Sequence, residues 1–221
     1  MNTELLLTED GSHTVFLPDL KVTYHSTHGS VQESNHVFID AGLKHIANNG
    51  KTTIRIFEMG FGTGLNALLT AIWAEKNQVA IEYTSIELFP LSKEELNALN
   101  YAEILGDEQH YFQKIHAAEW GVSNIISPFF NILKQQNSLL DYCPVNTFDL
   151  IYFDAFAPLI QPELWTTEVF IKLYDLLNNG GALTTYCSKS DVRRSMVAAG
   201  FTVEKIPGPP HKREMVRAVK K

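Results

Sequence analysis

One short segment constrains the fold more than any other: an apolar run that ends in an acid and then in alternate glycines. Residues 54–58 read Ile-Arg-Ile-Phe-Glu, and Gly60, Gly62 and Gly64 follow them. An apolar, β-branched run predicts a strand, and glycine permits backbone torsions and close approaches that a Cβ atom would block. We therefore predict a strand, a tight turn whose N–H groups face a ligand, and a helix that begins at Leu65.

The spacing of the glycines separates two kinds of nucleotide-binding turn. The dinucleotide fingerprint G-x-G-x-x-G requires glycine at position 65, where this chain has leucine. The G-x-G-x-G spacing behind Glu58 instead resembles motif I of the S-adenosylmethionine-dependent methyltransferases. The resemblance implies that Glu58, the glycines and the intervening Phe61 and Thr63 hold the cofactor. An ordinary glycine-rich turn is the alternative.

The composition describes a globular protein with one sizeable domain. The chain has 221 residues, and 45% of them are hydrophobic, which is enough for a full core. No apolar run approaches the roughly 20 residues that a membrane-spanning helix needs. Cys143 and Cys187 make no disulfide scaffold, and neither they nor the scattered histidines show metal-ligand spacing. We expect a cytoplasmic protein that binds no metal and contacts no membrane.

Strand-like and helix-like segments alternate along most of the chain, which predicts an α/β fold with a mostly parallel, doubly wound sheet. Asp10-Gly11 between two alternating runs predicts a small N-terminal β-hairpin over residues 4–17, followed by a third strand. We divide the chain into an N-terminal hairpin and helix, 1–50, packed on a methyltransferase core with a basic C-terminal region, 51–221. The expected core strands are 54–58, 81–87, 130–134, 148–154, 182–186, 201–205 and 215–219.

Local signals predict where helices begin and end. Ser30 and Glu33 match a capping box at the start of a helix that runs to about Ala47. Pro162 matches a helix start, and Gly180 matches the residue that ends the same helix. Residues 100–128 carry no clear pattern, and we expect mostly helix and loop there.

Polar side chains stand where three of the expected strands end. In a doubly wound sheet the ligand lies beyond the carboxyl ends of the strands. Glu87 ends the second strand, where a carboxylate accepts both hydroxyls of a nucleoside ribose; a capping or surface acid is the alternative. Asn137 follows the next strand, and we expect its amide to face the adenine edge. Asp154 ends the most apolar strand, where an acid is costly unless it is hydrogen-bonded or functional.

Asp154 opens the run Asp-Ala-Phe-Ala-Pro. This run resembles the Asp/Asn-Pro-Pro-aromatic motif of amino-group methyltransferases, which implies that Asp154 orients an amine beside the cofactor; an acid that holds a turn is the alternative. Phe156 and Trp165 are candidates for stacking on a base, although Trp165 fits a helix core equally well. Cys187 lacks the flanking signature of a covalent C5 methyltransferase, and a buried inert thiol is the better interpretation.

Several short sequence blocks, spread along nearly the whole chain, together carry a more specific resemblance. They are residues 33–38, 58–66, 86–91, 153–158 with 162–166, 192–194 and 212–215. Together they resemble one family, the methyltransferase domain of the MnmC proteins. The resemblance implies a Rossmann-like class I fold, S-adenosyl-L-methionine as cofactor, and methylation of 5-aminomethyl(-2-thio)uridine at the wobble position of tRNA. It also implies that Glu33 lies near the methionine end of the cofactor.

The MnmC proteins are bifunctional, and their second activity uses FAD. Since the sequence ends at Lys221, we expect no FAD in this chain. We also expect that a separate enzyme supplies the aminomethyl substrate.

The net charge of −7 hides an uneven distribution. From Ser188 onward there are nine Lys/Arg and three Asp/Glu, so the acidic excess lies in the preceding part. A basic end on an acidic body suits a polyanion such as tRNA, although a solvated basic tail is the simpler alternative. We assign phosphate contacts to two basic pairs, Arg193 with Arg194 and Lys212 with Arg213.

Two other functions remain alternatives. The same fold carries N-methyltransferases of small molecules or proteins, and a wholly acidic surface around Asp154 would favour them. A non-catalytic binding module is the second alternative. A decayed site, however, has no reason to keep its glycines together with both strand-end acids.

Overall fold

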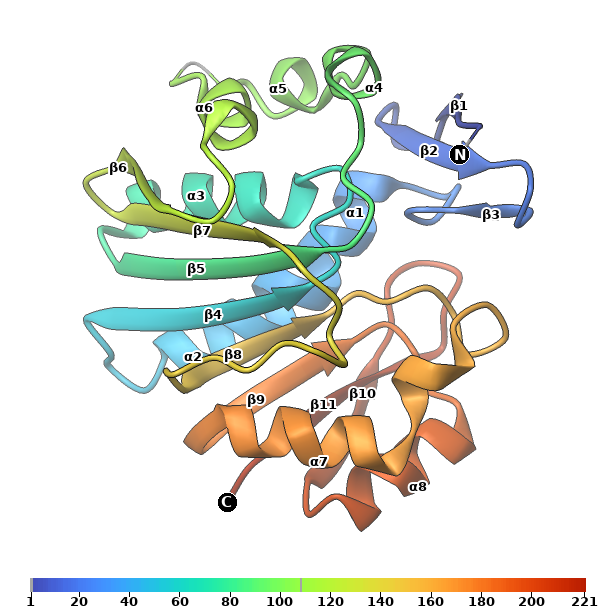
Figure 1. Ribbon diagram of the computed structural model, residues 1–221, viewed down its shortest axis with the longest axis vertical. Coiled ribbons are helices and arrows are strands. Elements are labelled where there is room, and N and C mark those ends of the chain that lie inside the picture. The colour runs from blue at the N-terminus through green and yellow to red at the C-terminus, as the bar shows by residue number, and fades with distance from the viewer. Residues whose placement is uncertain (1, 108) are drawn as a thin grey trace.

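The computed structural model describes residues 2–107 and 109–221, and an eight-stranded sheet forms its centre (Figure 1). The order across this sheet is β10 (Thr202–Pro207), β11 (Glu214–Val219), β9 (Leu177–Thr185), β8 (Phe148–Phe153), β4 (Thr53–Met59), β5 (Ala80–Glu87), β7 (Phe130–Gln136) and β6 (Ser123–Ser127). The pairs from β9 through β7 are parallel, whereas β10, β11 and β6 pair antiparallel at the edges. The predicted α/β class and mostly parallel sheet are confirmed.

The order in which the chain adds strands reverses in the middle of the sheet. From β4 the chain adds β5 and β7 towards one edge, and it then returns to add β8 and β9 on the other side of β4. At such a switch point the loops that leave neighbouring strands diverge and open a crevice at the carboxyl ends. The topology alone therefore locates a ligand site between the loops after β4 and β8.

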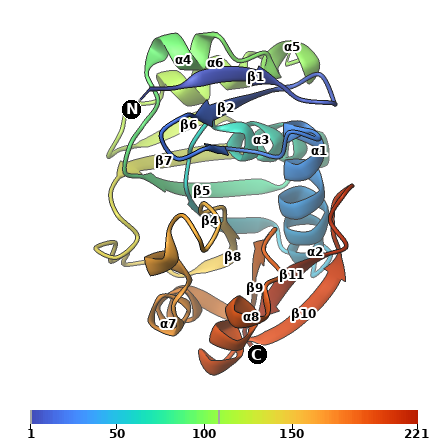
Figure 2. The same ribbon diagram turned by 90° about the vertical axis from the view of Figure 1, so that its right-hand side faces the viewer.

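Helices cover both faces of the sheet (Figures 1 and 2). On one face α1 (Ser30–Ser34), a π-helical stretch (Asn35–Leu43) and α2 (Lys44–Ala47) form a continuous helix beside α3 (Leu65–Asn77). On the other face lie α7 (Thr167–Leu176) and α8 (Ser190–Ala198). Because side chains alternate along a strand, Ile56 and Tyr152 enter the first core, whereas Phe57 and Phe153 enter the second. Short elements fill the connections: α4 (Lys93–Asn97), α5 (Tyr101–Ile104), α6 (Tyr111–Ala117) and a 3₁₀ turn (Pro162–Trp165).

A small three-stranded antiparallel sheet precedes the core, with β1 (Glu4–Leu7), β2 (His13–Leu17) and β3 (Val22–Thr23). The predicted N-terminal hairpin is confirmed. The Asn100 amide accepts from the His13 N–H and donates to the Gly11 carbonyl, which fixes the hairpin to the segment after β5. As a result, the chain that leaves β3 passes directly over the glycine loop.

The predicted helix from Ser30 to about Ala47 is confirmed, but three local helix signals are wrong: the capping box, Pro162 as the start of α7, and Gly180 as its end. Pro162 begins a separate 3₁₀ turn, and α7 begins at Thr167. Instead of forming a capping box, the Ser30 hydroxyl donates to the His13 carbonyl and the Glu33 carboxylate accepts from the Ser26 N–H, because the helix start is packed against the hairpin. Gly180 does not end α7, since the chain passes straight from Leu176 into β9 and Gly180 lies inside that strand.

The strand β6 falls in the segment where we expected helix and loop. Ile125 is 81% exposed, and the two buried residues, Ile126 and Ser127, are consecutive, so no alternating buried face produced a pattern in the sequence. Among the helices of the described ranges, none is long and apolar enough to cross a membrane.

Candidate functional site

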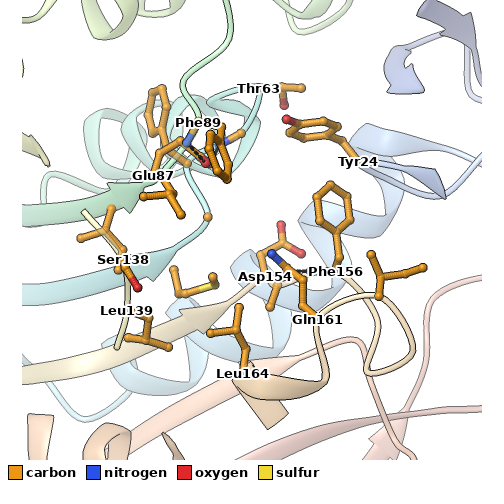
Figure 3. Close-up of a pocket in the computed structure, with 18 of the residues that line it drawn as sticks. Tyr24, Thr63, Glu87, Phe89, Ser138, Leu139, Asp154, Phe156, Gln161 and Leu164 are labelled. Carbon is orange, nitrogen blue, oxygen red and sulfur yellow. Dashed lines mark hydrogen bonds between the residues drawn. The ribbon is translucent and has the colours of Figure 1, made fainter. Parts of the chain in front are cut away.

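A cavity of about 340 Å³ lies at the switch point, beyond the carboxyl ends of β4, β5, β7 and β8 (Figure 3). The glycine loop and Glu87 form one side of it, and Asp154 and Phe156 form the opposite side. Of the residues selected from the sequence, those lining this cavity are Gly60, Phe61, Gly62, Thr63, Glu87, Asn137, Asp154 and Phe156.

The glycine loop lies in close contact with three neighbouring segments. Gly60, Gly62 and Gly64 all have positive φ, at 91°, 51° and 73°. A Cβ atom at these positions would lie 3.0 Å from the Asp154 carbonyl oxygen, 3.0 Å from the Tyr24 ring and 2.8 Å from the His116 ring, respectively. Each glycine is therefore required both by its torsion and by the space that it leaves.

Phe61 anchors the loop to the core. Its ring is 5% exposed and packs edge-on against His116 and Trp120, and the Lys134 ammonium lies 5.3 Å from its centroid. Lys134 donates to the Ile115 and His116 carbonyls, and burial lowers its pKa to about 8. Phe61 thus faces inward, and the loop offers its backbone to the cavity.

Glu87 binds the glycine loop from the next strand. Its two carboxylate oxygens accept from the Gly62 N–H at 3.0 Å and from the Phe89 N–H at 2.9 Å. Each carboxylate oxygen has a second lone pair, so two further donors can bind there. The Asn137 N–H donates to the Glu87 carbonyl, and the Asn137 side-chain oxygen accepts from the Ser138 N–H, which leaves the amide NH₂ as a donor.

The walls of the cavity between these polar groups are apolar. They consist of Met59, Ile86, Leu88, Leu139 and Leu164. A carboxylate with free lone pairs and apolar walls suit the nucleoside part of a ligand. The residues present therefore fit the nucleoside part of S-adenosylmethionine. The predicted ligand-facing N–H groups of the loop are not seen, because those of residues 60–62 and 64 donate to acceptors within the protein.

Asp154 is fixed by hydrogen bonds at the end of β8. Its N–H donates to the Met59 carbonyl at 3.2 Å, and its Oδ2 accepts from the Asn66 amide at 2.9 Å. Desolvation raises the pKa of Asp154 to about 7, against the Asn66 hydrogen bond that lowers it. At neutral pH this carboxyl group can therefore both accept and release a proton.

Glu58 lies behind the loop with no exposed surface, and it does not line the cavity. It accepts from the Ser85 hydroxyl at 2.7 Å, and desolvation raises its pKa to about 8. Glu58 is therefore protonated at neutral pH. Its Oε1 and the neighbouring Asn66 Oδ1 are both buried, and neither has a hydrogen-bond partner among the described residues, so the Glu58 proton has an acceptor beside it. If the protonated Glu58 donates to the Asn66 Oδ1, the Asn66 amide is oriented so that its NH₂ group faces Asp154.

The N-terminal segment covers the open side of the cavity. Tyr24 meets Phe156 edge-on with ring centroids 5.3 Å apart, and the Gln161 side chain accepts from the Phe156 N–H (Figure 3). His25 Nε2 lies 2.9 Å from the Thr63 hydroxyl, and burial lowers the pKa of His25 to about 4. A neutral histidine thus helps to hold the glycine loop.

The other predicted residues lie outside the cavity lining. Trp165 is 5% exposed, packs against Phe153 and Phe170, and donates its indole N–H to the Phe156 carbonyl, so its ring has no free face for a base. Instead, Trp165 acts on the site by holding the loop that carries Phe156.

Glu33 and the basic pairs lie beside the cavity or on the surface. Glu33 forms an ion pair with Lys212. Arg193 donates to the Ser188 carbonyl, Arg194 pairs with Asp191, and Arg213 is exposed.

Several residues of the site were missed from the sequence. Asn66 had a signal, since it is a polar side chain in the otherwise apolar first turns of α3. Tyr24 and Gln161 had none, because tertiary contacts alone bring them to the loop. Elsewhere, Glu9, His28 and His211 bring potential metal-ligand atoms within 4.8 Å of one another from three separate segments, which no sequence spacing could indicate.

Comparisons with known proteins identify relatives of this chain. A family model described as S-adenosyl-L-methionine-dependent methyltransferase matches residues 122–221. The tRNA 5-methylaminomethyl-2-thiouridine biosynthesis bifunctional protein MnmC of Ralstonia nicotianae is 31% identical over 210 residues, covering 88% of this chain and 31% of that protein. The protein of the same name from Leptospira interrogans is 34% identical over 220 residues, covering 87% and 32%. The chain thus spans about a third of the length of these relatives.

A solved structure has the same fold. The crystal structure of MnmC2 from Aquifex aeolicus matches with a TM-score of 0.80 and 23% identity, covering 100% of this chain and 70% of that chain. At this identity the match shows a shared architecture.

The buried acid behind the loop leads to a test by pH. The pKa of Glu58 is raised from 4.5 to about 8, so the folded protein holds a proton that the unfolded chain releases, and stability falls as pH rises through this window. Glu58→Gln is isosteric with the protonated acid and removes this loss. We expect denaturant unfolding to show the variant gaining on wild type from pH 5 to pH 8, by up to about 1.4 kcal/mol per pH unit.

Titrating groups that do not interact with Glu58 are common to both proteins and cancel in this comparison. Asp154, whose charge acts on Glu58, contributes to the difference together with it. If the difference in unfolding free energy between Glu58→Gln and wild type stays constant from pH 5 to pH 8, Glu58 is ionised in the folded protein.

Proposed function

This chain belongs to the S-adenosyl-L-methionine-dependent methyltransferases, and on that premise we propose that it methylates the primary amine of 5-aminomethyl(-2-thio)uridine at the wobble position of tRNA. The observation that carries the proposal is Asp154: a carboxyl group with a pKa raised to about 7 faces the glycine loop across one cavity. The names of the relatives supply the class of substrate.

Within this proposal, the cavity residues hold the methyl donor. Glu87 accepts from the ribose hydroxyls, the glycine loop leaves room for the cofactor to lie against its backbone, and Asn137 with the apolar walls surrounds the base. When bound, S-adenosylmethionine supplies an activated methyl group for in-line transfer to a nucleophile. The protein contributes position and orientation, which can lower the barrier by roughly 7–11 kcal/mol.

The amine must lose a proton before it can act as the nucleophile. A free alkyl amine resembles lysine, with a pKa of about 10.4, so it arrives as the ammonium ion. The Asp154 carboxylate accepts one of its N–H groups, fixes the direction of the lone pair and takes up the proton. The Asn66 hydrogen bond holds the carboxylate in place for this transfer.

The proposed macromolecular substrate is tRNA. Phe156 lies at the rim next to Asp154, where an aromatic ring can stack on the uridine. Arg213 and Lys189 are exposed, and no carboxylate of the described residues lies within ion-pair distance of either. We assign phosphate contacts to these two side chains. A separate enzyme would supply the aminomethyl group.

One observation favours a second candidate, the methylation of another amine on a small molecule or a protein. Much of the basic C-terminal region is neutralised internally, since Lys205 pairs with Glu214 and Arg217 pairs with Glu204. The surface therefore offers a weaker field to a polyanion than the sequence implies.

Replacing the candidate proton acceptor tests the mechanism. Asp154→Asn keeps the shape and the contact with Asn66 but cannot take up a proton. We expect methyl transfer to tRNA that carries 5-aminomethyluridine to fall by roughly 10²–10⁴-fold, as for loss of a general base. In wild type, kcat/KM should rise with pH through the region of the Asp154 pKa, about 7.

Two controls accompany this variant. Cys187→Ser should stay active, since Cys187 is buried and its pKa is raised by desolvation. Asp149→Asn, at the other end of β8, should lower stability through the lost contacts to Lys51 and Asn178 while the folded enzyme keeps its turnover. Near-normal turnover in Asp154→Asn would eliminate Asp154 as the acceptor.

The salt dependence of tRNA binding separates the two candidate functions. If Arg213 and Lys189 contact phosphates, the double alanine variant should bind tRNA more weakly than wild type does. The slope of log K against log salt should also become less negative by about 1–2, since each contact contributes about −0.7 to −0.9 to that slope. S-adenosylmethionine affinity should not change. Lys76→Ala, exposed at the C-terminal end of α3, is the control. A wild-type salt slope in the double variant would remove the phosphate assignment.

A further inference from the structure

The loop between β10 and β11 returns to the N-terminal helix beside the site (Figure 2). The Pro207 carbonyl accepts from His36 Nε2 at 2.9 Å, and the His211 ring stacks on His28 with centroids 3.9 Å apart. These contacts fix both ends of the loop. Lys212 lies in this loop, and its side chain points towards the same helix.

The Lys212 ammonium occupies a formed cation site. It donates to Glu33 Oε1 at 2.6 Å and lies 4.3 Å from the centroid of the Tyr186 ring. The second oxygen of Glu33 accepts from the Ser26 N–H at 2.8 Å, so the carboxylate is held independently of the lysine. A fixed carboxylate and an aromatic face are a suitable environment for an alkylammonium group.

This cation site adjoins the proposed reaction centre. The Tyr186 hydroxyl donates at 2.9 Å to the carbonyl of Ala155, the residue after Asp154. The charges of Glu33 and Lys212 both act on Asp154, Glu33 raising its pKa and Lys212 lowering it. The ammonium of Lys212 therefore lies in the field of the same carboxyl group that is proposed to receive the substrate amine.

We propose that Glu33 and Tyr186 form an entry subsite for a primary alkylammonium group, which Lys212 fills in the free protein and which the substrate amine occupies before it passes to Asp154. The inference rests on the proposed function, since 5-aminomethyluridine carries the same –CH₂–NH₃⁺ group that ends a lysine side chain. Lys212 acts as an internal competitor for this subsite.

A second lysine–glutamate ion pair, between β10 and β11, has no such aromatic ring of the described residues over its ammonium. Lys205 and Glu214 form this pair, also at 2.8 Å. Lys205→Met is therefore a matched control for Lys212→Met, because both remove one cation from one ion pair of the β10–β11 unit.

Competition predicts a gain of affinity when the competitor is removed. The apparent affinity of a ligand is reduced by the fraction of protein whose site is open, and a change that opens the site removes this reduction. Calorimetry with the nucleoside 5-aminomethyluridine should therefore give at least threefold tighter binding to Lys212→Met than to wild type or Lys205→Met. Uridine, which lacks the ammonium, should show no such difference.

Two further arms complete the test. Glu33→Gln should bind 5-aminomethyluridine at least tenfold more weakly than wild type, with its cooperative thermal transition retained; Glu33→Asp serves if the first variant does not fold. n-Propylammonium, which lacks the uracil ring, should also bind more tightly to Lys212→Met. A Lys212→Met variant that binds both amines no more tightly than wild type overturns the subsite.

The outcomes separate this inference from the proposed function. If wild-type protein fails to methylate aminomethyl-tRNA but Lys212→Met binds n-propylammonium more tightly, the subsite stands and the tRNA substrate is wrong. If methylation occurs but neither amine binds more tightly to Lys212→Met, the tRNA function stands and the subsite is wrong.

Discussion

The close packing of the glycine loop against its three neighbours is the constraint on which the site depends. Gly60 lies against the backbone that carries Asp154, Gly62 lies against the Tyr24 ring, and Gly64 lies against His116. One loop thus sets the positions of the candidate proton acceptor, of the covering N-terminal segment and of the helix behind them. A side chain at any of the three glycines would have a strained backbone torsion and would press on one of these neighbours.

Behind the loop, desolvation governs the chemistry of the acids. The charge of Asp154 acts on Glu58 and raises its pKa further, because like charges repel in a medium of low polarity. Protonation of Glu58 removes this conflict and lets Asn66 bridge towards Asp154. Asp154 is then free to exchange a proton with an amine. Glu58, the acid that precedes the glycines, therefore helps through Asn66 to hold Asp154 in place at the cavity.

The sequence predicted the parts of this site that follow from local pattern and topology. The apolar run before Gly60 indicated β4, and the rule for doubly wound sheets indicated that Glu87 and Asp154 would meet at one edge. It could not indicate Tyr24, because that residue reaches the loop only through the packing of the N-terminal hairpin. Nor could it separate Trp165 in the core from Phe156 at the rim, since both are aromatic residues in one short segment. The pairing of Lys212 with Glu33 joins residues from opposite ends of the chain, so the charge pattern alone suggested a free cation.

The most direct test of the account is the binding of S-adenosylmethionine by calorimetry, because the glycine loop and Glu87 are assigned to that ligand. We expect wild-type protein to bind it, and Glu87→Gln to bind it roughly tenfold or more weakly, since a hydrogen bond to a charged group contributes about 1.5–3 kcal/mol. Glu82→Gln, an exposed acid on the same strand, should bind as wild type does. Absence of binding to wild type, or equal binding to Glu87→Gln, would contradict the account.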